Sequence, residues 1–377
     1  MFKSVLVLGH VRGIRIEIHA SWLVIFVLLM ASLGAGLRQA HPDWPMMVVM
    51  TTTLATVLAF FASIVAHELG HSLVAIRRGV PVQAITLFIF GGVAQLGRDS
   101  ESANDEFWIA VAGPVVSFAL AVIFGILSLA TAAFSDPLSV GLGWLALINL
   151  VVAIFNLIPG FPLDGGRVFR ALVWKYTGDA RKGMNAAVMG GRLVAYLLFA
   201  VGLWNVLAIG NLIGGLWIMV IAWFLLTTAE ASGKGYHLRQ RLQGLRARDF
   251  ASRDVPMVEP GISIQDWIDH HVLPQGNRSC LVGEGDQVLG LVTLSDIRRI
   301  PRDQWTATPI ADAMTPSERL IRVTADTSAD DVLQLVNEHN LNQVPVMDGD
   351  GLHGWIDRSR LLRSLELHLE LNRNARG

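Results

Sequence analysis

Long apolar runs in the first 230 residues constrain the fold of this chain more than any other feature. Only 24 of its 61 Asp, Glu, Lys and Arg residues fall in this part, against 37 in the last 147 residues. Crossing a bilayer takes about 20 apolar residues. Six runs of suitable length lie near 20–37, 46–76, 107–132, 139–158, 186–208 and 211–229. We therefore predict a six-helix membrane domain at 1–230, followed by a soluble part, and exclude an average soluble enzyme.

Lys and Arg residues are unevenly distributed among the connections between these runs. They occur before the first run, in the second and fourth connections and throughout the soluble part, whereas the first connection has only Arg38 and the third and fifth have none. Cytoplasmic loops are enriched in Lys and Arg, so we expect a multi-pass cell-membrane protein with both termini in the cytoplasm. The single cysteine, Cys280, cannot form an internal disulfide, which fits a reducing compartment.

The second apolar run contains three ionisable side chains, which are costly inside a bilayer and indicate a functional site. His67-Glu68-Leu69-Gly70-His71 is an H-E-x-x-H sequence. Residues i and i+4 share a helical face, so both imidazoles can bind one ion, and Glu68 can hold a metal-bound water. Zinc suits imidazole and carboxylate, and catalytic zinc usually has three protein ligands. A third ligand is therefore expected at similar depth; a structural histidine pair is the alternative.

The best candidate for the third ligand is Asp164, in the segment 156–167 with the sequence NLIPGFPLDGGR. Pro and Gly break the helix here, which is tolerated at membrane depth only where protein or a water cavity satisfies the backbone. Arg77 and Arg78 mark the cytoplasmic boundary of the second run. At 1.5 Å per residue, His71 lies roughly 9 Å and His67 roughly 15 Å inside it. Asp164 precedes Arg167 by three residues and is expected near the same boundary. The alternative is a helix-ending turn in which Asp164 caps the next helix.

These two motifs, in this order and each at an apolar run, resemble those of the site-2 protease family of intramembrane zinc metalloproteases. The segment 67–71 is similar to the family's H-E-x-x-H, and the segment 156–165 is similar to its N-x-x-P-x-x-x-x-D-G motif. Gly91-Gly92, after the apolar run 82–90, resemble the family's membrane-associated hairpin. Ala112-Gly113-Pro114 resemble the start of its third-span motif, although Ser117 stands where many members have Asn.

The resemblance implies a zinc-dependent intramembrane endopeptidase that cleaves transmembrane segments. His67, His71 and Asp164 would bind one Zn²⁺ per chain. Glu68 would be the general base on the zinc-bound water and later the proton donor to the leaving amine. Asn156 would hydrogen-bond the substrate backbone or the developing oxyanion; a helix-bending polar contact is the equal alternative.

The resemblance also implies a class of substrate, a single-pass membrane protein such as an anti-sigma factor or a membrane-tethered regulator. A transmembrane helix must unwind before hydrolysis, and a strand edge near residues 83–92 could bind the unwound segment by strand addition. A hairpin that only packs under the spans is equally compatible. The last two runs, joined by Gly210 and Asn211, could be a mobile gate or plain packing helices.

An internal repeat organises the soluble part, where residues 247–300 align with 311–364. Each copy predicts a short strand, a helix at 263–271 or 328–340, two strands and a second helix. The repeat resembles a pair of CBS domains, placed here at 247–306 and 307–370 after a linker helix at 231–246. The expected fold is a polytopic α-helical membrane protein, with six transmembrane helices and a membrane-associated β-hairpin, plus a cytoplasmic α/β CBS-pair module.

A ligand for this module is suggested by the first copy. In many CBS domains a Thr or Ser and an Asp contact the phosphates and ribose of an adenine nucleotide, which the resemblance transfers to Thr293 and Asp296. The second copy has Asp357 and Arg360 there. The alternative is a module that binds no ligand and serves as a scaffold and a homodimer contact.

A membrane transporter or channel regulated by CBS domains is the alternative for the whole chain. It uses the same apolar runs and the same soluble part, but it does not explain H-E-x-x-H together with a distant Asp-Gly at equal depth. The lipid bilayer is an expected partner in either case. The formal net charge of −1 gives no electrostatic reason to expect nucleic acid.

Overall fold

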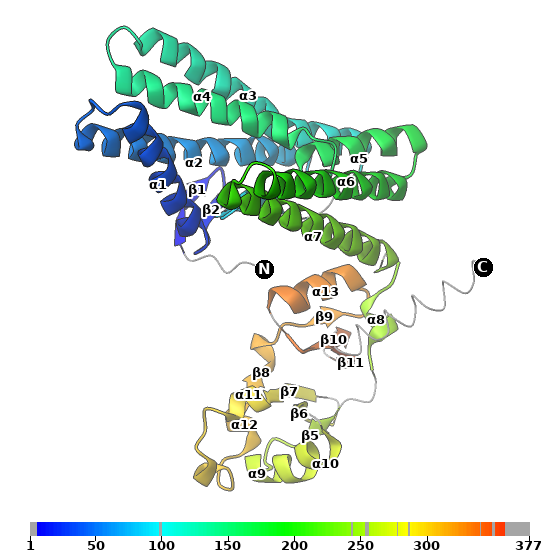
Figure 1. The fold of residues 1–377 in the computed structure, drawn as a ribbon. Coiled ribbons are helices and arrows are strands. Elements are labelled where there is room, and N and C mark those ends of the chain that lie inside the picture. The colour runs from blue at the N-terminus through cyan, green and yellow to red at the C-terminus, as the bar shows by residue number, and fades with distance from the viewer. Residues whose placement is uncertain are drawn as a thin grey trace. The chain divides into compact units, whose positions relative to one another are not determined.

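The computed structural model describes residues 6–97, 100–242, 244–252, 256–276, 278–285, 287–339, 341–348 and 351–358. The chain forms two compact units that divide between Tyr236 and His237. We call the first the membrane unit and the second the tail unit, and describe each by itself (Figure 1).

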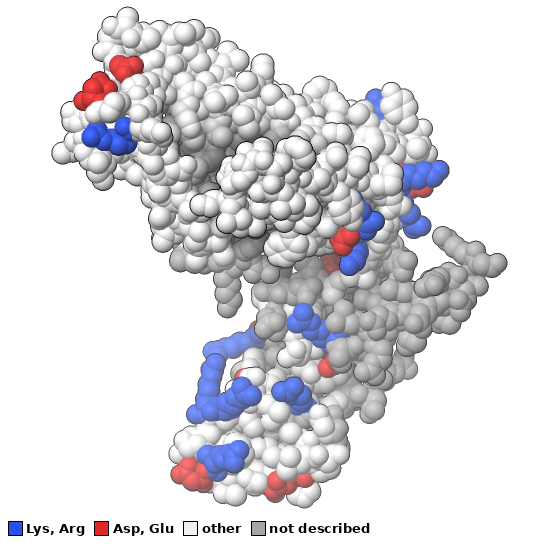
Figure 2. Space-filling view, viewed as in Figure 1, with Lys and Arg blue, Asp and Glu red and all other residues white. Residues whose placement is uncertain are grey.

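Six long apolar helices, the number predicted, are found among the described residues, and each is long and apolar enough to cross a membrane. They are α1 (Trp22–Ala40), α2 (Met46–Arg77), α3 (Ala103–Thr131), α4 (Asp136–Asn156), α6 (Ala180–Leu207) and α7 (Leu212–Leu242). On the face shown in Figure 2, the charged side chains of the membrane unit gather toward its two ends and leave a wide uncharged surface between them. An uncharged surface can face the hydrocarbon of a bilayer, and the backbone groups beneath it are already hydrogen-bonded within the helices.

Two helical features differ from the prediction. A shorter helix, α5 (Asp164–Thr177), follows α4 and ends at Gly178, whose φ of 68° is left-handed. It carries several charged residues on one face, so it does not stand out as an apolar run. The residues expected to form a separate linker helix instead continue α7 as far as Leu242.

A four-stranded sheet, in the order β1-β2-β3-β4, completes the membrane unit. The predicted hairpin is confirmed as β3 (Val82–Phe88) and β4 (Gly91–Leu96), paired antiparallel. Two strands near the start of the chain, β1 (Leu6–Val11) and β2 (Ile14–Ile18), extend it, with β2 parallel to β3. Strand β4 therefore lies at one edge of the sheet and β1 at the other.

The tail unit contains two copies of a strand–helix–strand–strand pattern, as the repeat predicts. In the first copy β5 (Met257–Val258) is parallel to β6 (Ser279–Glu284), which pairs antiparallel with β7 (Gln287–Thr293). In the second, β9 (Val323–Thr324), β10 (Gln343–Asp348) and β11 (Gly351–Asp357) have the same pairing. The intervening helical segments are α9 (Ile264–Trp267), the π-helical turn η1 (Ile268–Val272) and α10 (Leu273–Gln275) in one copy, and α13 (Ala329–Glu338) in the other.

Matching hydrogen bonds begin these helical segments. The hydroxyl of Ser263 accepts from the backbone N–H of Asp266 at 3.1 Å, and that of Ser328 accepts from the N–H of Asp331 at the same distance. A final short helix, α11 (Leu294–Ile297), closes the first copy. The corresponding helix expected in the second copy lies outside the described residues. The α/β character of the tail unit is thus confirmed.

Each copy is completed by the segment that precedes the other copy in the chain. Leu242 and two residues of α8 (Ala247–Phe250), Ala247 and Phe250, belong to the hydrophobic core built on β9–β11 and α13. Ile310 of α12 (Ile310–Ala313) belongs to the core of the first copy, and β8 (Thr315–Pro316) pairs with β7. The short 3₁₀ turns η2 (Arg302–Gln304) and η3 (Ser317–Arg319) lie beside these connections. The two copies therefore fold as one interlocked module.

Candidate metal centre

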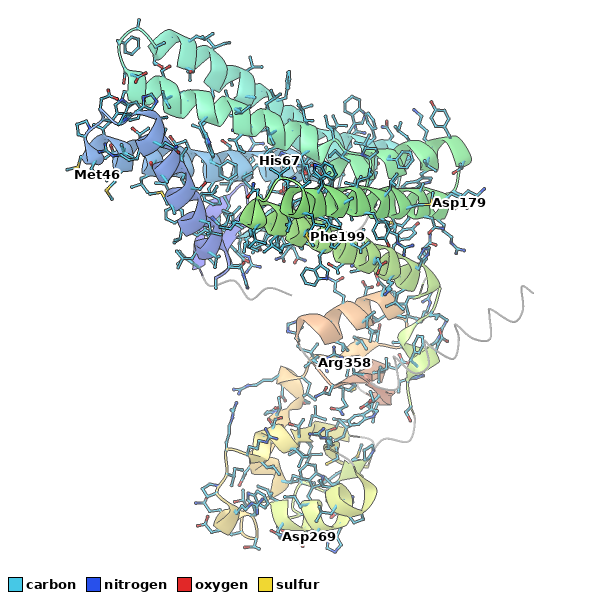
Figure 3. The ribbon with its side chains drawn as sticks, in the orientation of Figure 1. Met46, His67, Asp179, Phe199, Asp269 and Arg358 are labelled. Atoms are coloured by element: carbon cyan, nitrogen blue, oxygen red, sulfur yellow. The ribbon has the colours of Figure 1, made fainter. Side chains whose placement is uncertain are left out.

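Three predicted ligands, far apart in the sequence, converge in the membrane unit. His67 and His71 lie one turn apart on α2, and Asp164 is the first residue of α5. Nε2 of each histidine lies 3.1 Å from Oδ2 of Asp164, and the two Nε2 atoms lie 3.2 Å apart. These donor atoms can hold a metal ion. Figure 3 places His67 well inside the unit, far from Met46 at the start of α2.

The other ring nitrogens of the histidines are held by α3. Nδ1 of His71 donates to the carbonyl oxygen of Ile109 at 2.6 Å. Nδ1 of His67 and the hydroxyl of Ser117 share a hydrogen bond of 2.8 Å. Such contacts fix the orientation of metal-binding imidazoles. The sequence singled out Ser117 only as a departure from the family's motif, and did not predict its contact with His67.

The His71 contact also tests whether the cluster fits a metal. A carbonyl oxygen can only accept, so Nδ1 of His71 carries the proton in this bond, and Nε2 of the neutral ring keeps a lone pair. That lone pair faces the Asp164 carboxylate, an acceptor, at 3.1 Å. Two acceptors at this distance repel, so the contact requires either a metal ion bound by both atoms or a second proton on the ring. The donor set therefore fits a bound metal ion, and both imidazoles are only 4% exposed.

Gly113 of α3 keeps the space beside the two imidazoles clear. A Cβ atom at this position would overlap Nε2 of His71 and lie 2.6 Å from Nε2 of His67. A glycine is therefore required for α3 to approach the ring atoms that face Asp164. The Ala-Gly-Pro sequence was the signal for this position, although sequence alone did not relate it to the metal ligands.

The irregular segment 157–163 places Asp164 and is anchored to α6. The backbone N–H of Phe161 donates to the carbonyl of Ala187 at 3.0 Å. The peptide bond between Phe161 and Pro162 is cis. Gly165 and Gly166, which follow Asp164, lie against the backbone of residues 157–161.

Glu68 follows His67 on α2 and lies beside the edge strand β4. A Cβ atom at Gly92 would lie 2.5 Å from Cγ of Glu68 and 3.2 Å from its Oε1. The backbone of β4 therefore passes directly over this carboxylate. The hairpin glycine thus brings a strand edge and the predicted general base together.

Asn156 ends α4, and its described hydrogen bond stays within that helix. Its amide nitrogen donates to the carbonyl of Val152 at 3.1 Å. A polar contact within the helix is what the sequence left open as the alternative. The assignment to the substrate or the oxyanion stays a prediction.

Thr293 and Asp296, the predicted nucleotide contacts, bond to each other in the tail unit. The backbone N–H and the hydroxyl of Thr293 donate to Oδ2 of Asp296 at 2.9 and 2.7 Å, and together they cap α11. At the corresponding place in the second copy, Asp357 accepts from Gln343 at 3.1 Å. Arg360 lies outside the described residues.

Comparisons with known proteins identify the family of the membrane unit and support the repeat. The model of peptidase family M50 matches residues 55–135 and 125–201, and the CBS domain model matches 247–303 and 310–367. A Synechocystis sp. protein named as a zinc metalloprotease is 33% identical over 365 residues, which cover 95% of this chain and 94% of that protein. The chain belongs to peptidase family M50.

Two further proteins are similar to this chain. Rip3 of Mycobacterium tuberculosis, also named as a zinc metalloprotease, is 36% identical over 319 residues, covering 83% of this chain and 80% of Rip3. A solved structure, the site-2 protease from Methanocaldococcus jannaschii, is 31% identical and has a TM-score of 0.41; the match covers 60% of this chain and 94% of that one.

The predicted family and enzyme class are thereby confirmed. The chain is an M50 zinc metalloprotease, a hydrolase with several membrane-spanning helices and a pair of CBS domains. The ligand and catalytic roles of individual residues stay predictions.

Proposed function

We propose that this M50 peptidase cleaves transmembrane segments of single-pass membrane proteins at a zinc centre formed by His67, His71 and Asp164. The observation that carries the proposal is the convergence of their donor atoms within 4.8 Å of one another. Two imidazoles and one carboxylate suit Zn²⁺ and leave a fourth position for water, with one ion per chain. The transporter or channel alternative gives no reason for this convergence.

Glu68 is proposed as the group that moves protons. Zinc, when bound, polarises the scissile carbonyl and lowers the pKa of a water molecule. Glu68, next to His67 on α2, accepts the proton of the attacking water and returns it to the leaving amine. The Asn156 amide, on turning away from Val152, donates to the carbonyl oxygen as negative charge develops there.

Strand β4 is proposed as the site that binds the unwound substrate. It is an edge of the four-stranded sheet, so its outward backbone groups can pair with an added strand. Gly92 brings this edge against Glu68. A segment paired with β4 therefore passes the proposed general base in extended form. Anti-sigma factors and membrane-tethered regulators belong to this class of substrate.

We place both termini in the cytoplasm, with the metal centre near the cytoplasmic side. The Lys and Arg distribution supports this orientation. The cationic end of α2, at Arg77 and Arg78, lies less than two turns beyond His71. Substrate cleavage would then release a fragment to the cytoplasm.

For the CBS pair we propose a regulatory role, with an adenine nucleotide at Thr293 and Asp296 and a homodimer through the module. Helix α7 supports a link to the protease, since it runs without a break to Leu242, which is buried in the core of the second copy. Calorimetry of the full-length protein with AMP, ATP and S-adenosylmethionine tests the ligand. Binding heat in the parent that is lost in Asp296→Ala supports the nucleotide site. No binding heat with any of the three compounds would rule out the nucleotide site.

The proteolytic proposal is tested with Glu68→Gln in the full-length protein. Membrane proteins retained by this variant are identified by mass spectrometry, and each is co-expressed with parent and variant. We expect the parent to cleave its substrate and the variant to bind zinc without cleaving. Glu230→Gln, which changes a carboxylate on α7, is the matched control and should cleave like the parent. Cleavage by Glu68→Gln at the parent rate would overturn the proposal.

A further inference from the structure

A buried cluster of charges lies beside the metal centre and has no part in the reaction described above. Glu106, in the first turn of α3, is 2% exposed. Nε of Arg167 donates to its Oε1 at 3.0 Å, and Nη1 of Arg170 lies 3.7 Å from the same atom. Arg170 is also buried, whereas the Arg167 side chain is 19% exposed. Burying charges is costly even when they are paired. Their placement therefore calls for a role.

Both arginines belong to α5, the helix that begins with Asp164. Arg167 lies one turn and Arg170 two turns after this ligand. The guanidinium of Arg170 also lies 4.9 Å from the ring centroid of Tyr236 on α7. Asp164 directly follows the irregular segment 157–163, so no regular element holds it on that side. The contacts along α5 therefore determine where its carboxylate points. The Glu106 cluster is an ionic contact between α5 and α3.

The same face of α3 holds the two histidines. Ile109 accepts from His71, Gly113 lies against both imidazoles, and Ser117 bonds His67. Counted from Glu106, these residues are at i+3, i+7 and i+11, the spacing of a single helical face. One face of α3 thus contacts the histidines of α2 through three positions and the helix of Asp164 through a fourth.

We propose that Glu106 is a positioning residue for the metal centre, which it serves by holding α5 through Arg167 and Arg170 so that Asp164 faces the histidines. The face of α3 formed by these four positions then sets the ligand geometry from both sides. This inference rests on the proposed zinc centre and adds residues that touch neither metal nor substrate. A cluster that merely joins two helices would change stability and leave the bound metal unaltered.

The test compares two carboxylates that are neighbours in the sequence. Glu106→Gln removes the charge that faces α5. Asp105→Asn removes the charge that bonds Arg78, the residue after α2, at 2.9 Å, and is the matched control. The zinc affinity of each full-length protein is measured by chelator competition. The d–d absorption spectrum of each protein saturated with Co²⁺ then reports the geometry of the ligands.

For Glu106→Gln we expect the zinc Kd to rise roughly 10- to 100-fold, the usual effect of losing an outer-shell partner, and the Co²⁺ spectrum to change. Asp105→Asn should keep the parent affinity and spectrum. If the parent binds one zinc and Glu106→Gln matches it in affinity and spectrum, the positioning role is wrong while the zinc centre stands. If the parent binds no zinc at these residues, the proposed function itself fails.

A second variant decides the matter if Glu106→Gln does not fold. Arg167→Lys keeps a cation opposite Glu106 but loses the planar guanidinium that donates through Nε. We expect a folded protein, by size-exclusion chromatography and circular dichroism, with a smaller rise in the zinc Kd and a shifted Co²⁺ spectrum. Parent-like values for both quantities in this variant would overturn the proposal.

Discussion

Nε2 of His71 lies 3.1 Å from Oδ2 of Asp164, although 93 residues separate the two in the chain. The contact joins the last two turns of a long apolar helix to the start of a short charged one. It exists because α3 lies beside both helices and contacts each. The predictions below test the parts of this arrangement separately.

Gly113→Ala should abolish metal binding while the helix remains intact. The added methyl group would overlap Nε2 of His71, and alanine is a better helix former than glycine. Gly125→Ala on the same helix, where a Cβ meets only Ala146 at 3.8 Å, is the control. Metal analysis of the purified proteins should find zinc in Gly125→Ala and almost none in Gly113→Ala. Equal zinc content in both would contradict the close approach of α3.

Ser117→Ala should weaken zinc binding without emptying the site. It removes the hydroxyl that holds Nδ1 of His67, and loss of such a partner raises the metal Kd roughly 10- to 100-fold. Ser128→Ala, which removes a hydroxyl that α3 bonds to Ser139 of α4, is the control. Chelator competition measures both affinities. An unchanged affinity in Ser117→Ala would restrict this hydroxyl to packing.

Gly92→Ala should separate catalysis from metal binding. The backbone at Gly92 is outside the left-handed region, so alanine is tolerated, but its Cβ would displace the Glu68 side chain. We expect at least about a tenfold lower rate of substrate cleavage, with the zinc content of the parent. A parent-like rate would show that β4 does not limit the position of Glu68.

Cys280 should resist thiol reagents in the folded protein. Burial raises the pKa of its thiol to about 12, so at pH 8 the reactive thiolate is almost absent. Labelling should therefore require denaturant. Leu273→Cys places a thiol at a position that is 73% exposed and should be labelled without denaturant. Rapid labelling of Cys280 in the native protein would contradict its burial in the first copy.

The cluster of His67, His71 and Asp164 could be predicted from the sequence because ionisable residues are conspicuous in apolar runs. His67 and His71 had helical spacing, and Asp164 followed a helix break. Ser117 and Glu106 gave no such signal, because spacing alone does not tell which neighbouring helix a polar residue of α3 faces. Their roles depend on how α2, α3 and α5 pack, which is a tertiary property.

Other features of the fold were missed for different reasons. Strands β1 and β2 are short, and β2 joins the sheet by pairing with β3, which lies more than 60 residues later in the chain. Helix α5 is amphipathic and too charged to be recognised as an apolar run. The interlocking of the two copies in the tail unit was also invisible, because α8 lies in one copy by sequence and packs in the core of the other.

The most direct test of the account is the zinc content of the full-length protein and of three single variants, His67→Ala, His71→Ala and Asp164→Ala. His41→Ala, which changes a histidine near Trp44 and Asp136 outside the centre, is the control. We predict one zinc per chain in the parent and in His41→Ala, and far less than one in each of the three variants. One zinc per chain in all five proteins would contradict the proposed centre.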